Sequence, residues 1–279
     1  MQRSLTINKI ISRLCLLLTL LGSSALADER VLQTLQSINP SYYHRLEPDA
    51  LGRPLHIVVK LPPGYGENQH KRYPVIYLLD GGAIFPMLAG YYNYLVNQDT
   101  VPEAMLVALS YGSNDFEHGN HRSTDYTAPT DQREYWGGAA TFQQVLKNDL
   151  FPLIESQYRA DPGRRVLFGQ SIGGQFVLFT ALTEPDLFWG RVASNPALHR
   201  NLHFFLQRHS SQHSGNTRLF VASASDDETR FREPAKAWID HWGAEDELPW
   251  TLRAITIEGY GHFSLITESF RQGMEWVFD

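Results

Sequence analysis

Residues 165–174 read RVLFGQSIGG, a short apolar run that leads into a serine surrounded by glycines. The apolar run is typical of a buried strand, and the residues that follow have the spacing of a helix. A sharp turn between a strand and a helix holds its serine in a strained backbone conformation, so the neighbouring residues must be small. Gly169, Gly173 and Gly174 meet that requirement. The stretch predicts that Ser171 is a nucleophile on such a turn; the alternative is a structural glycine-rich turn.

Short apolar runs alternate with longer amphipathic segments on both sides of this turn. A continuous apolar run is typical of a strand buried on both faces. The alternation predicts an α/β fold, with a mostly parallel central sheet and helices on both faces. No repeat, linker or large lid domain is visible in the sequence. We expect strands at residues 55–61, 75–79, 105–109, 165–168, 219–222 and 252–257, and helices at 139–158, 173–182, 231–242 and 263–277.

The segment 110–138 breaks this alternation. It is polar and rich in Gly and Asn, yet it contains Tyr126, Tyr135 and Trp136. Long loops without secondary structure of their own are usually functional or disordered, and aromatic residues disfavour disorder. Open α/β sheets bind ligands at the carboxyl ends of their strands. We expect the segment to form a wall of a binding pocket there.

A serine nucleophile needs a base, and the base needs a group that orients it. In hydrolases with this strand–serine–helix turn, an acid and then a histidine follow in the chain, each after a later strand. His262 fits, because it follows the expected strand 252–257 and precedes the last expected helix. A surface histidine at the start of that helix is the alternative.

The acid should follow the expected strand 219–222, where residues 225–228 read SDDE. Glu228 lies three residues after the small residue Ser225, a spacing at which such turns place the acid. We therefore expect Glu228 to orient the histidine, with Asp227 as the alternative. Another acid of this cluster can cap the helix that begins nearby.

Two backbone N–H groups are candidates for an oxyanion hole. The strand–serine–helix turn directs the N–H of Ile172 towards the position of an oxyanion. A second donor usually comes from the loop after an early central strand. Here the strand 75–79 is followed by DGG at 80–82, and glycine lets a backbone approach a substrate closely. We expect Gly82 to be that donor; the alternative is an ordinary strand-end turn.

The composition excludes several other classes of protein. Of the 279 residues, 43% are hydrophobic and 19% charged, so the chain is neither disordered nor collagen-like. The formal net charge of −6 argues against a nucleic acid as the main partner. His199, His203, His209 and His213 resemble a metal cluster, but no carboxylate accompanies them at a ligand spacing. We expect no metal and no organic cofactor.

The first 27 residues have the pattern of a secretory signal peptide. Positive residues precede the apolar run 14–21, and the small-x-small triplet ALA follows at 25–27. The run is shorter than the roughly 18 residues that a membrane span needs. Cleavage would leave residues 28–279 as a single domain and would remove Cys15, which excludes a thiol nucleophile and a disulfide. We expect a periplasmic or secreted protein without stable membrane insertion after cleavage.

Four segments occur in the order seen in esterase-D-like α/β-hydrolases, which the chain resembles from about residue 55 to residue 277. They read YLLDGG at 77–82, RSTDYT at 122–127, GQSIGG at 169–174 and SNPAL at 194–198. Within this family the chain is most similar to siderophore esterases, which hydrolyse trilactones such as enterobactin and salmochelins. The RSTDYT segment is the more selective match. The family's common S-P-S-L segment reads NPAL here, a difference expected to alter the pocket wall.

The resemblance implies roles for individual residues. Ser171 would be the nucleophile, His262 the base and Glu228 the acid, although some siderophore esterases work with a Ser–His dyad. By the same analogy Arg122 would help to hold an anionic or catecholate-bearing substrate near the oxyanion hole. We expect Tyr126, in the same segment, to contact the substrate as well.

The sequence thus predicts a serine carboxylic-ester hydrolase that works through an acyl-enzyme and acts on a small-molecule ester, with siderophore trilactones as the first candidates. Feruloyl and acetyl esterases belong to the same superfamily, so an exported esterase of phenolic or acetyl esters is one alternative. The other is an exported binding protein on a hydrolase scaffold without turnover. A complete serine, acid and histidine in the right order argues against that second alternative.

Overall fold

The computed structural model describes residues 42–113, 115, 117–131, 133–209 and 215–279. The expected signal peptide at 1–27, the start of the mature domain at residue 28, Cys15 and His213 lie outside the described residues. The described residues belong to one compact unit, Pro40–Asp279. Among them, no helix combines the length and the apolar character that crossing a membrane would require.

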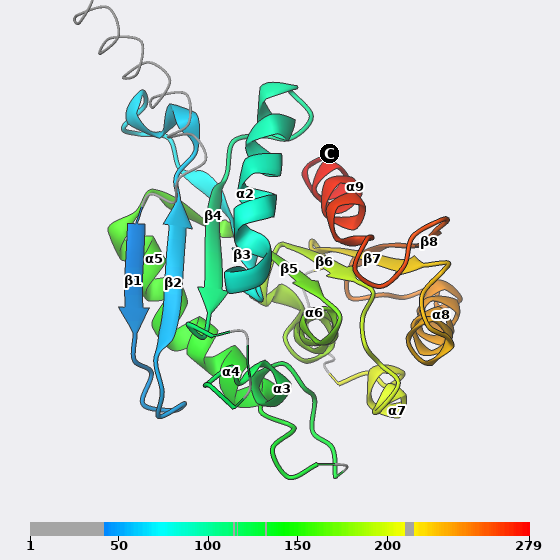
Figure 1. Ribbon diagram of the computed structural model, residues 1–279. Helices are drawn as coiled ribbons and strands as arrows, with labels where there is room; N and C mark the ends of the chain where they lie inside the picture. Colours follow the sequence, from blue (N-terminus) through cyan, green and yellow to red (C-terminus); the bar gives the residue numbers. More distant parts are fainter. Residues whose placement is uncertain (1–41, 114, 116, 132, 210–214) are drawn as a thin grey trace, which may run out of the picture. The chain divides into compact units, whose positions relative to one another are not determined.

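A twisted eight-stranded sheet organises this unit (Figure 1). The strand order is β1-β2-β4-β3-β5-β6-β7-β8. β2 runs antiparallel to both β1 and β4, and the remaining neighbours are parallel. The strands are β1 (Tyr42–Leu46), β2 (Leu55–Lys60), β3 (Tyr73–Leu78), β4 (Met105–Ser110), β5 (Ala160–Gln170), β6 (Gly190–Ser194), β7 (Arg218–Ala224) and β8 (Thr251–Ile257).

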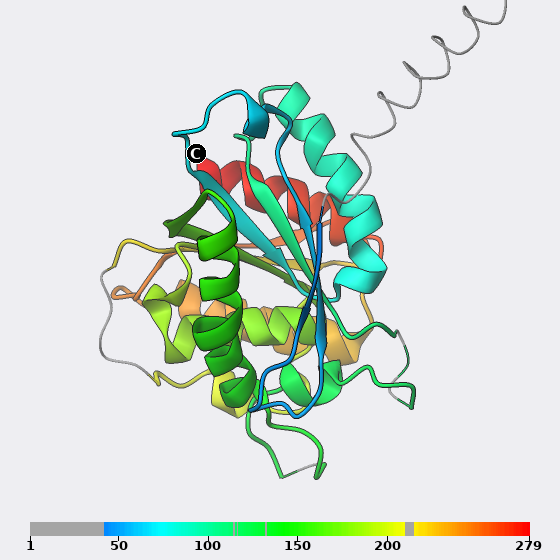
Figure 2. The same ribbon diagram turned by 90° about the vertical axis from the view of Figure 1, so that its left-hand side faces the viewer.

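Helices cover both faces of the sheet, as Figures 1 and 2 show. They are α2 (Gly81–Asn97), α3 (Arg122–Asp125), α4 (Ala139–Val145), α5 (Phe151–Gln157), α6 (Ile172–Thr183), α7 (Leu202–Phe205), α8 (Thr229–Gly243) and α9 (Ile266–Phe278). Two short 3-10 helices, η1 (Pro63–Gly66) and η3 (Pro185–Leu187), and a π-helical segment between α4 and α5, η2 (Leu146–Leu150), complete the set within the described residues. Successive strand residues point to opposite faces. Ile76 and Leu78 of β3 therefore belong to the hydrophobic cluster that includes residues of α2 and α9, whereas Val75 and Tyr77 belong to the one that includes residues of α5, α6 and α8.

The predicted α/β fold is confirmed, and every predicted strand and helix corresponds to an observed one. Within the described ranges no large lid domain is inserted between the strands. The pattern analysis misses β1, β6, α2 and the short helices α3 and α7. β6 is buried but reads GRVAS, which contains no apolar run. α2 begins with two glycines and contains Pro86, and both residue types disfavour a helix.

A buried arginine in β6 holds the far end of α6. Arg191 is fully buried. Its guanidinium donates hydrogen bonds to the carbonyl oxygens of Thr180, Glu184, Pro185 and Phe188 at 2.8–3.3 Å, and to the Thr180 hydroxyl at 3.0 Å. The last carbonyls of a helix have no partner within the helix. Burial lowers the pKa of Arg191, so these acceptors must compensate for the hydration that its charge has lost.

Replacing this arginine should destabilise the fold. In Arg191→Met the buried carbonyls lose their donors, and the free energy of unfolding should fall by about 3 kcal/mol. Urea denaturation followed by circular dichroism measures the change. The exposed Arg45, changed to Met in the same way, is the control and should cost less than about 0.5 kcal/mol. Equal stability of the two variants would contradict the capping role of Arg191.

Candidate active site

The turn between β5 and α6 has the strained geometry that the sequence predicts. Ser171 has φ 58° and ψ −116°, in the left-handed region that side chains other than glycine rarely adopt. A Cβ on Gly169 would lie 2.3 Å from the Gly173 carbonyl oxygen, and one on Gly174 would lie 2.9 Å from the Ser194 carbonyl oxygen. Only glycine fits at these two positions without a shift of the backbone. The Ser171 N–H donates to the same Ser194 oxygen at 2.9 Å.

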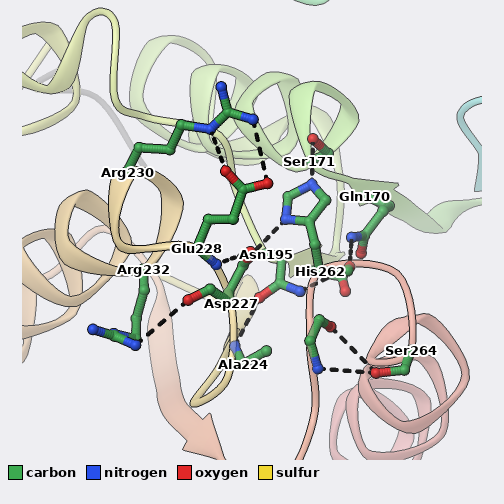
Figure 3. A network of polar contacts seen from close by, with 12 residues as sticks. Gln170, Ser171, Asn195, Ala224, Asp227, Glu228, Arg230, Arg232, His262 and Ser264 are labelled. Atoms are coloured by element: carbon green, nitrogen blue, oxygen red, sulfur yellow. Dashed lines mark hydrogen bonds and ion pairs between the residues drawn. The ribbon is translucent and has the colours of Figure 1, made fainter.

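Ser171, His262 and Asp227 form a continuous polar series (Figure 3). His262 Nδ1 lies 2.7 Å from Asp227 Oδ2, and His262 Nε2 lies 2.9 Å from Ser171 Oγ. A carboxylate can only accept a hydrogen bond, so Nδ1 donates to Asp227 and Nε2 is left to accept from the serine hydroxyl. The side chains of His262 and Asp227 are 12% and 2% exposed, so the series is largely shielded from water.

The expectation that Glu228 orients the histidine is wrong, and the alternative residue Asp227 occupies that position. Glu228 is 64% exposed, and its carboxylate pairs with Arg230 at 2.8 Å. Its backbone N–H donates to Asp227 Oδ1 at 2.7 Å, so Glu228 supports the acid through its main chain. The reason lies in the turn after β7: the Asp226 N–H is held by the Tyr260 carbonyl at 2.9 Å. Asp227 then faces His262, whereas Glu228 becomes the residue that precedes α8.

Both candidate oxyanion donors lie at helix N-termini. Ile172 is the first residue of α6, and Gly82 is the second residue of α2. The first N–H groups of a helix have no acceptor within the helix, so they remain available to a ligand. The start of α2 lies close to β4, since a Cβ on Gly81 would lie 2.7 Å from the Ala108 Cβ.

Arg122 lies beside this helix start. Its Nε and Nη2 donate to the two oxygens of Asp80 at 2.7 and 2.8 Å. Burial favours a lower pKa for Arg122, but the Asp80 carboxylate outweighs it and raises the pKa. The guanidinium therefore stays charged, and this bidentate pair fastens the segment 110–138 to the loop that precedes α2.

The expectation that Tyr126 contacts the substrate is wrong. Tyr126 is fully buried, and its ring packs against Phe142 and Phe176 at centroid distances of 5.3 and 5.8 Å. Its hydroxyl accepts a hydrogen bond from the Asp80 N–H at 3.5 Å, and burial raises its pKa. Tyr126 is the residue directly after α3. Its ring lies in the hydrophobic core, and its hydroxyl group supports the backbone of Asp80.

Two cavities open at Ser171. The larger has a volume of about 570 Å³ and the smaller about 360 Å³. Residues of the segment 110–138 line both, as expected of a pocket wall. The larger cavity is lined by Asp80, Gly82, Ala83, Ile84, Ser110, Tyr111, Ser113, Asn120, Arg122, Gln170, Ser171, Glu228, Arg230, Phe231, His262, Phe263 and Ile266. The smaller is lined by Ser123, Thr127, Arg133, Tyr135, Trp136, Ser171, Ile172, Gln175, Ala197, His199, Arg200, Arg230 and Phe231.

Two amide side chains that the sequence analysis does not single out hold the histidine loop. Gln170 Nε2 and Asn195 Nδ2 both donate to the His262 carbonyl oxygen, at 2.5 and 3.0 Å (Figure 3). Asn195 Oδ1 also accepts from the Ala224 N–H at 2.7 Å, at the end of β7. Asn195 has φ 40° and is 2% exposed. The segment NPAL at 195–198 differs from the family's S-P-S-L pattern at two positions. One is Asn195, which supports the His262 loop, and the other is Ala197, which lines the smaller cavity.

The three described histidines that were considered as metal ligands, His199, His203 and His209, do not form a metal site. Among the described residues, no group of three or more His, Cys, Asp or Glu side chains is placed to hold a metal ion. The His199 ring packs edge-on against Phe231 at 4.9 Å. His203 lies beside Gln207, and His209 stacks on Phe204.

Residues 49–270 match the protein family described as "Putative esterase". The ferri-bacillibactin esterase BesA of Bacillus subtilis is 36% identical in an alignment of 154 residues, which covers 49% of this chain and 52% of that protein. The apo-salmochelin esterase of Escherichia coli O6:H1 is 31% identical over 146 residues, covering 49% of this chain and 45% of that protein. The chain thus spans about half the length of these curated relatives. A solved structure of an IroE-like serine hydrolase from Shewanella oneidensis matches with a TM-score of 0.73 at 25% identity, covering 85% of this chain and 80% of that one.

The two acids next to each other provide a sharp test of the geometry. Asp227→Asn should lower kcat towards a p-nitrophenyl ester by a factor on the order of 10³–10⁴, because the imidazole loses its orienting carboxylate. Glu228→Gln should lower it by less than about threefold, since the Glu228 side chain points to Arg230. Steady-state kinetics of the two variants decides between them, and a larger loss in Glu228→Gln would refute the assignment.

The support of the histidine loop by Asn195 can be tested separately. Asn195→Gly accommodates the positive φ but removes both side-chain hydrogen bonds, so it should lower kcat by about tenfold with little change in KM. Asn195→Asp keeps the acceptor for the Ala224 N–H and loses the donor to His262, so a similar loss would assign the effect to the His262 bond. A fall in thermal stability with unchanged kcat would show that Asn195 is merely structural.

Proposed function

The chain belongs to the Esterase family, and from that premise we propose that it is a serine hydrolase of carboxylic esters that works through an acyl-enzyme. One observation carries the proposal: the hydrogen-bonded series Ser171–His262–Asp227 reaches the surface of an open cavity of about 570 Å³. A binding protein without turnover does not need a strained serine, an imidazole and a buried carboxylate joined by hydrogen bonds.

The reaction follows from the order of these groups. Ser171 Oγ attacks the ester carbonyl carbon while His262 Nε2 takes the hydroxyl proton, and the carboxylate of Asp227 stabilises the imidazolium. The N–H groups of Ile172 and Gly82 hold the oxyanion. His262 then gives its proton to the alcohol oxygen, the ester C–O bond breaks, and the alcohol leaves. Water repeats both steps on the acyl-enzyme, which releases the acid and restores the serine.

We propose siderophore trilactones as the substrates. Two relatives are named as esterases of ferri-bacillibactin and of apo-salmochelin. The larger cavity has room for a bulky lactone, and the smaller one offers separate space beyond the serine. Arg122, in the wall of the larger cavity, would help to hold a polar group of such a substrate near the oxyanion hole.

The cellular setting belongs to the same proposal. The signal-peptide pattern at 1–27 supports an exported mature chain, residues 28–279, in the periplasm or outside the cell. The mechanism needs neither a metal nor an organic cofactor, because the attacking group, the base and the oxyanion donors all come from the chain. The net charge of −6 supports a small-molecule substrate rather than a nucleic acid.

A turnover panel with purified residues 28–279 tests the proposal. Ser171→Ala should lower kcat by a factor on the order of 10⁶, because the attacking oxygen is lost. The wild type should also be labelled by a fluorophosphonate, which reacts with an activated serine, and Ser171→Ala should not be. Near-normal turnover in Ser171→Ala would refute the mechanism.

The same panel separates the substrate classes. It compares enterobactin, with and without iron, against p-nitrophenyl acetate, p-nitrophenyl butyrate and methyl ferulate. Serine-dependent cleavage that is most efficient on the trilactone supports the siderophore proposal. Cleavage confined to the simple or phenolic esters keeps the mechanism and overturns the siderophore assignment. No turnover and no labelling would favour a binding protein.

A further inference from the structure

Two cavities share Ser171, and two further side chains line both of them. Arg230 and Phe231 line both the larger and the smaller cavity. The Phe231 ring stacks on the His262 imidazole at a centroid distance of 4.4 Å and an interplanar angle of 29°. The Arg230 guanidinium lies 4.6 Å from the centre of the Phe231 ring. An ester bound at Ser171 therefore has two different places for its two halves.

The position of the histidine decides which half goes where. His262 lines the larger cavity and is absent from the lining of the smaller one. The alcohol oxygen must receive its proton from His262 Nε2 when the ester bond breaks, so the alcohol half faces that side. Of the two expected oxyanion donors, Gly82 lines the larger cavity and Ile172 lines the smaller one, so the ester carbonyl would lie where the two cavities meet. The acyl half, which stays on the serine, is left with the smaller cavity.

The two cavities differ in charge. In the larger cavity, Asp80 pairs with Arg122 and Glu228 pairs with Arg230, so each lining carboxylate has a lining guanidinium as its partner. The smaller cavity is lined by Arg133 and Arg200 besides the shared Arg230, and no carboxylate side chain is present among the described residues that line it. Because Arg230 is the partner of Glu228, Arg133 and Arg200 are the two positive side chains that distinguish the smaller cavity.

Aromatic rings hold two of these guanidinium groups in place. Arg200 lies 4.4 Å and Arg133 lies 5.8 Å from the centre of the Trp136 ring. Arg200 Nε also donates to His199 Nε2 at 3.0 Å. The pKa of His199 is lowered by burial and by the nearby charges of Arg200 and Arg230, so the imidazole stays neutral beside them. A guanidinium fixed on an aromatic face recognises planar carboxylates through two parallel hydrogen bonds.

We propose that the cavity of about 360 Å³ is the acyl subsite, and that Arg133 and Arg200 make it selective for a planar acyl group that carries a negative charge. This inference rests on the proposed esterase function. It adds an orientation of the ester relative to the serine and a chemical class for the acyl half, neither of which follows from the family.

Matched esters test the orientation. The first pair has the same leaving group and differs in the acyl half: 4-nitrophenyl benzoate and the 4-nitrophenyl monoester of terephthalic acid. The second pair places the charge on the alcohol half: phenyl benzoate and 4-carboxyphenyl benzoate. Each rate is divided by the rate of hydroxide-catalysed hydrolysis, which corrects for intrinsic reactivity. We expect kcat/KM to be about tenfold higher for the charged acyl group, as for one charged hydrogen bond, and to show no such gain for the charged alcohol.

Variants then assign the preference to its residues. Arg200→Gln and Arg133→Gln should each reduce the ratio of charged to neutral acyl substrate by about threefold to tenfold. The ratio cancels any general loss of activity. Arg200→Lys keeps the charge but not the planar donor pair, so it should retain part of the preference. Arg45→Gln removes an exposed charge that lines neither cavity and is the matched control with an unchanged ratio.

Three results would overturn the inference: equal rates for the two acyl substrates, a preference that follows the charge on the alcohol half, or a preference that survives both arginine substitutions. A separate measurement covers failure of the esterase function itself. If none of these esters is turned over, isothermal titration with benzoate and with its neutral isostere benzamide still tests the subsite. Benzoate binding that is lost in Arg200→Gln would keep the anion subsite while the esterase function fails, whereas equal affinity for benzoate and benzamide would overturn the subsite.

Discussion

The strained turn at Ser171 is the constraint on which the rest of the site depends. A residue with φ 58° is held there only because the structure around it leaves no alternative. Gly169 and Gly174 allow this close packing, because a Cβ atom at either position would overlap a neighbouring backbone carbonyl oxygen. The Ser171 N–H donates to Ser194, the last residue of β6, and the Ser171 carbonyl accepts from the Ala197 N–H just after that strand. The serine side chain is thereby aimed before any substrate arrives, which is the kind of preorganisation that lowers the barrier to reaction.

The segment that fixes the serine also fixes its partners. Asn195 accepts from the end of β7, which leads to Asp227, and donates to the carbonyl of His262 beyond β8. Three loops that follow different strands are therefore joined at one residue, itself held at φ 40° and almost fully buried. Parallel strands bring these loops to one edge of the sheet, but they do not set the distances between them. Side-chain hydrogen bonds such as those of Asn195 and Gln170 do so here.

The sequence predicts those features that depend on local pattern and chain order. The fold follows from apolar runs, and Ser171 and His262 follow from a glycine-flanked turn and from the strands that precede them. The choice between Asp227 and Glu228 depends on how the turn after β7 is held by Tyr260, a contact between distant residues that leaves no local signal. Tyr126 fails for a related reason: its place in a polar segment suggests exposure, yet the ring is buried against Phe142 and Phe176. β6 is hidden because Arg191, an unusual residue for a buried strand, interrupts its apolar character while capping α6.

Phe231 lines both cavities and also packs against His262, the base in the proposed reaction. Phe231 lies flat against the His262 ring, so it limits rotation of the imidazole out of the line between Ser171 and Asp227. The same ring lines both the larger cavity, whose carboxylates are paired with arginines, and the smaller cavity, which Arg133 and Arg200 line. Arg230 covers this ring and is itself tied to Glu228, which borders Asp227 through its backbone N–H. In the proposed reaction, each half of the ester would therefore contact Phe231, the side chain that packs against the proposed base His262.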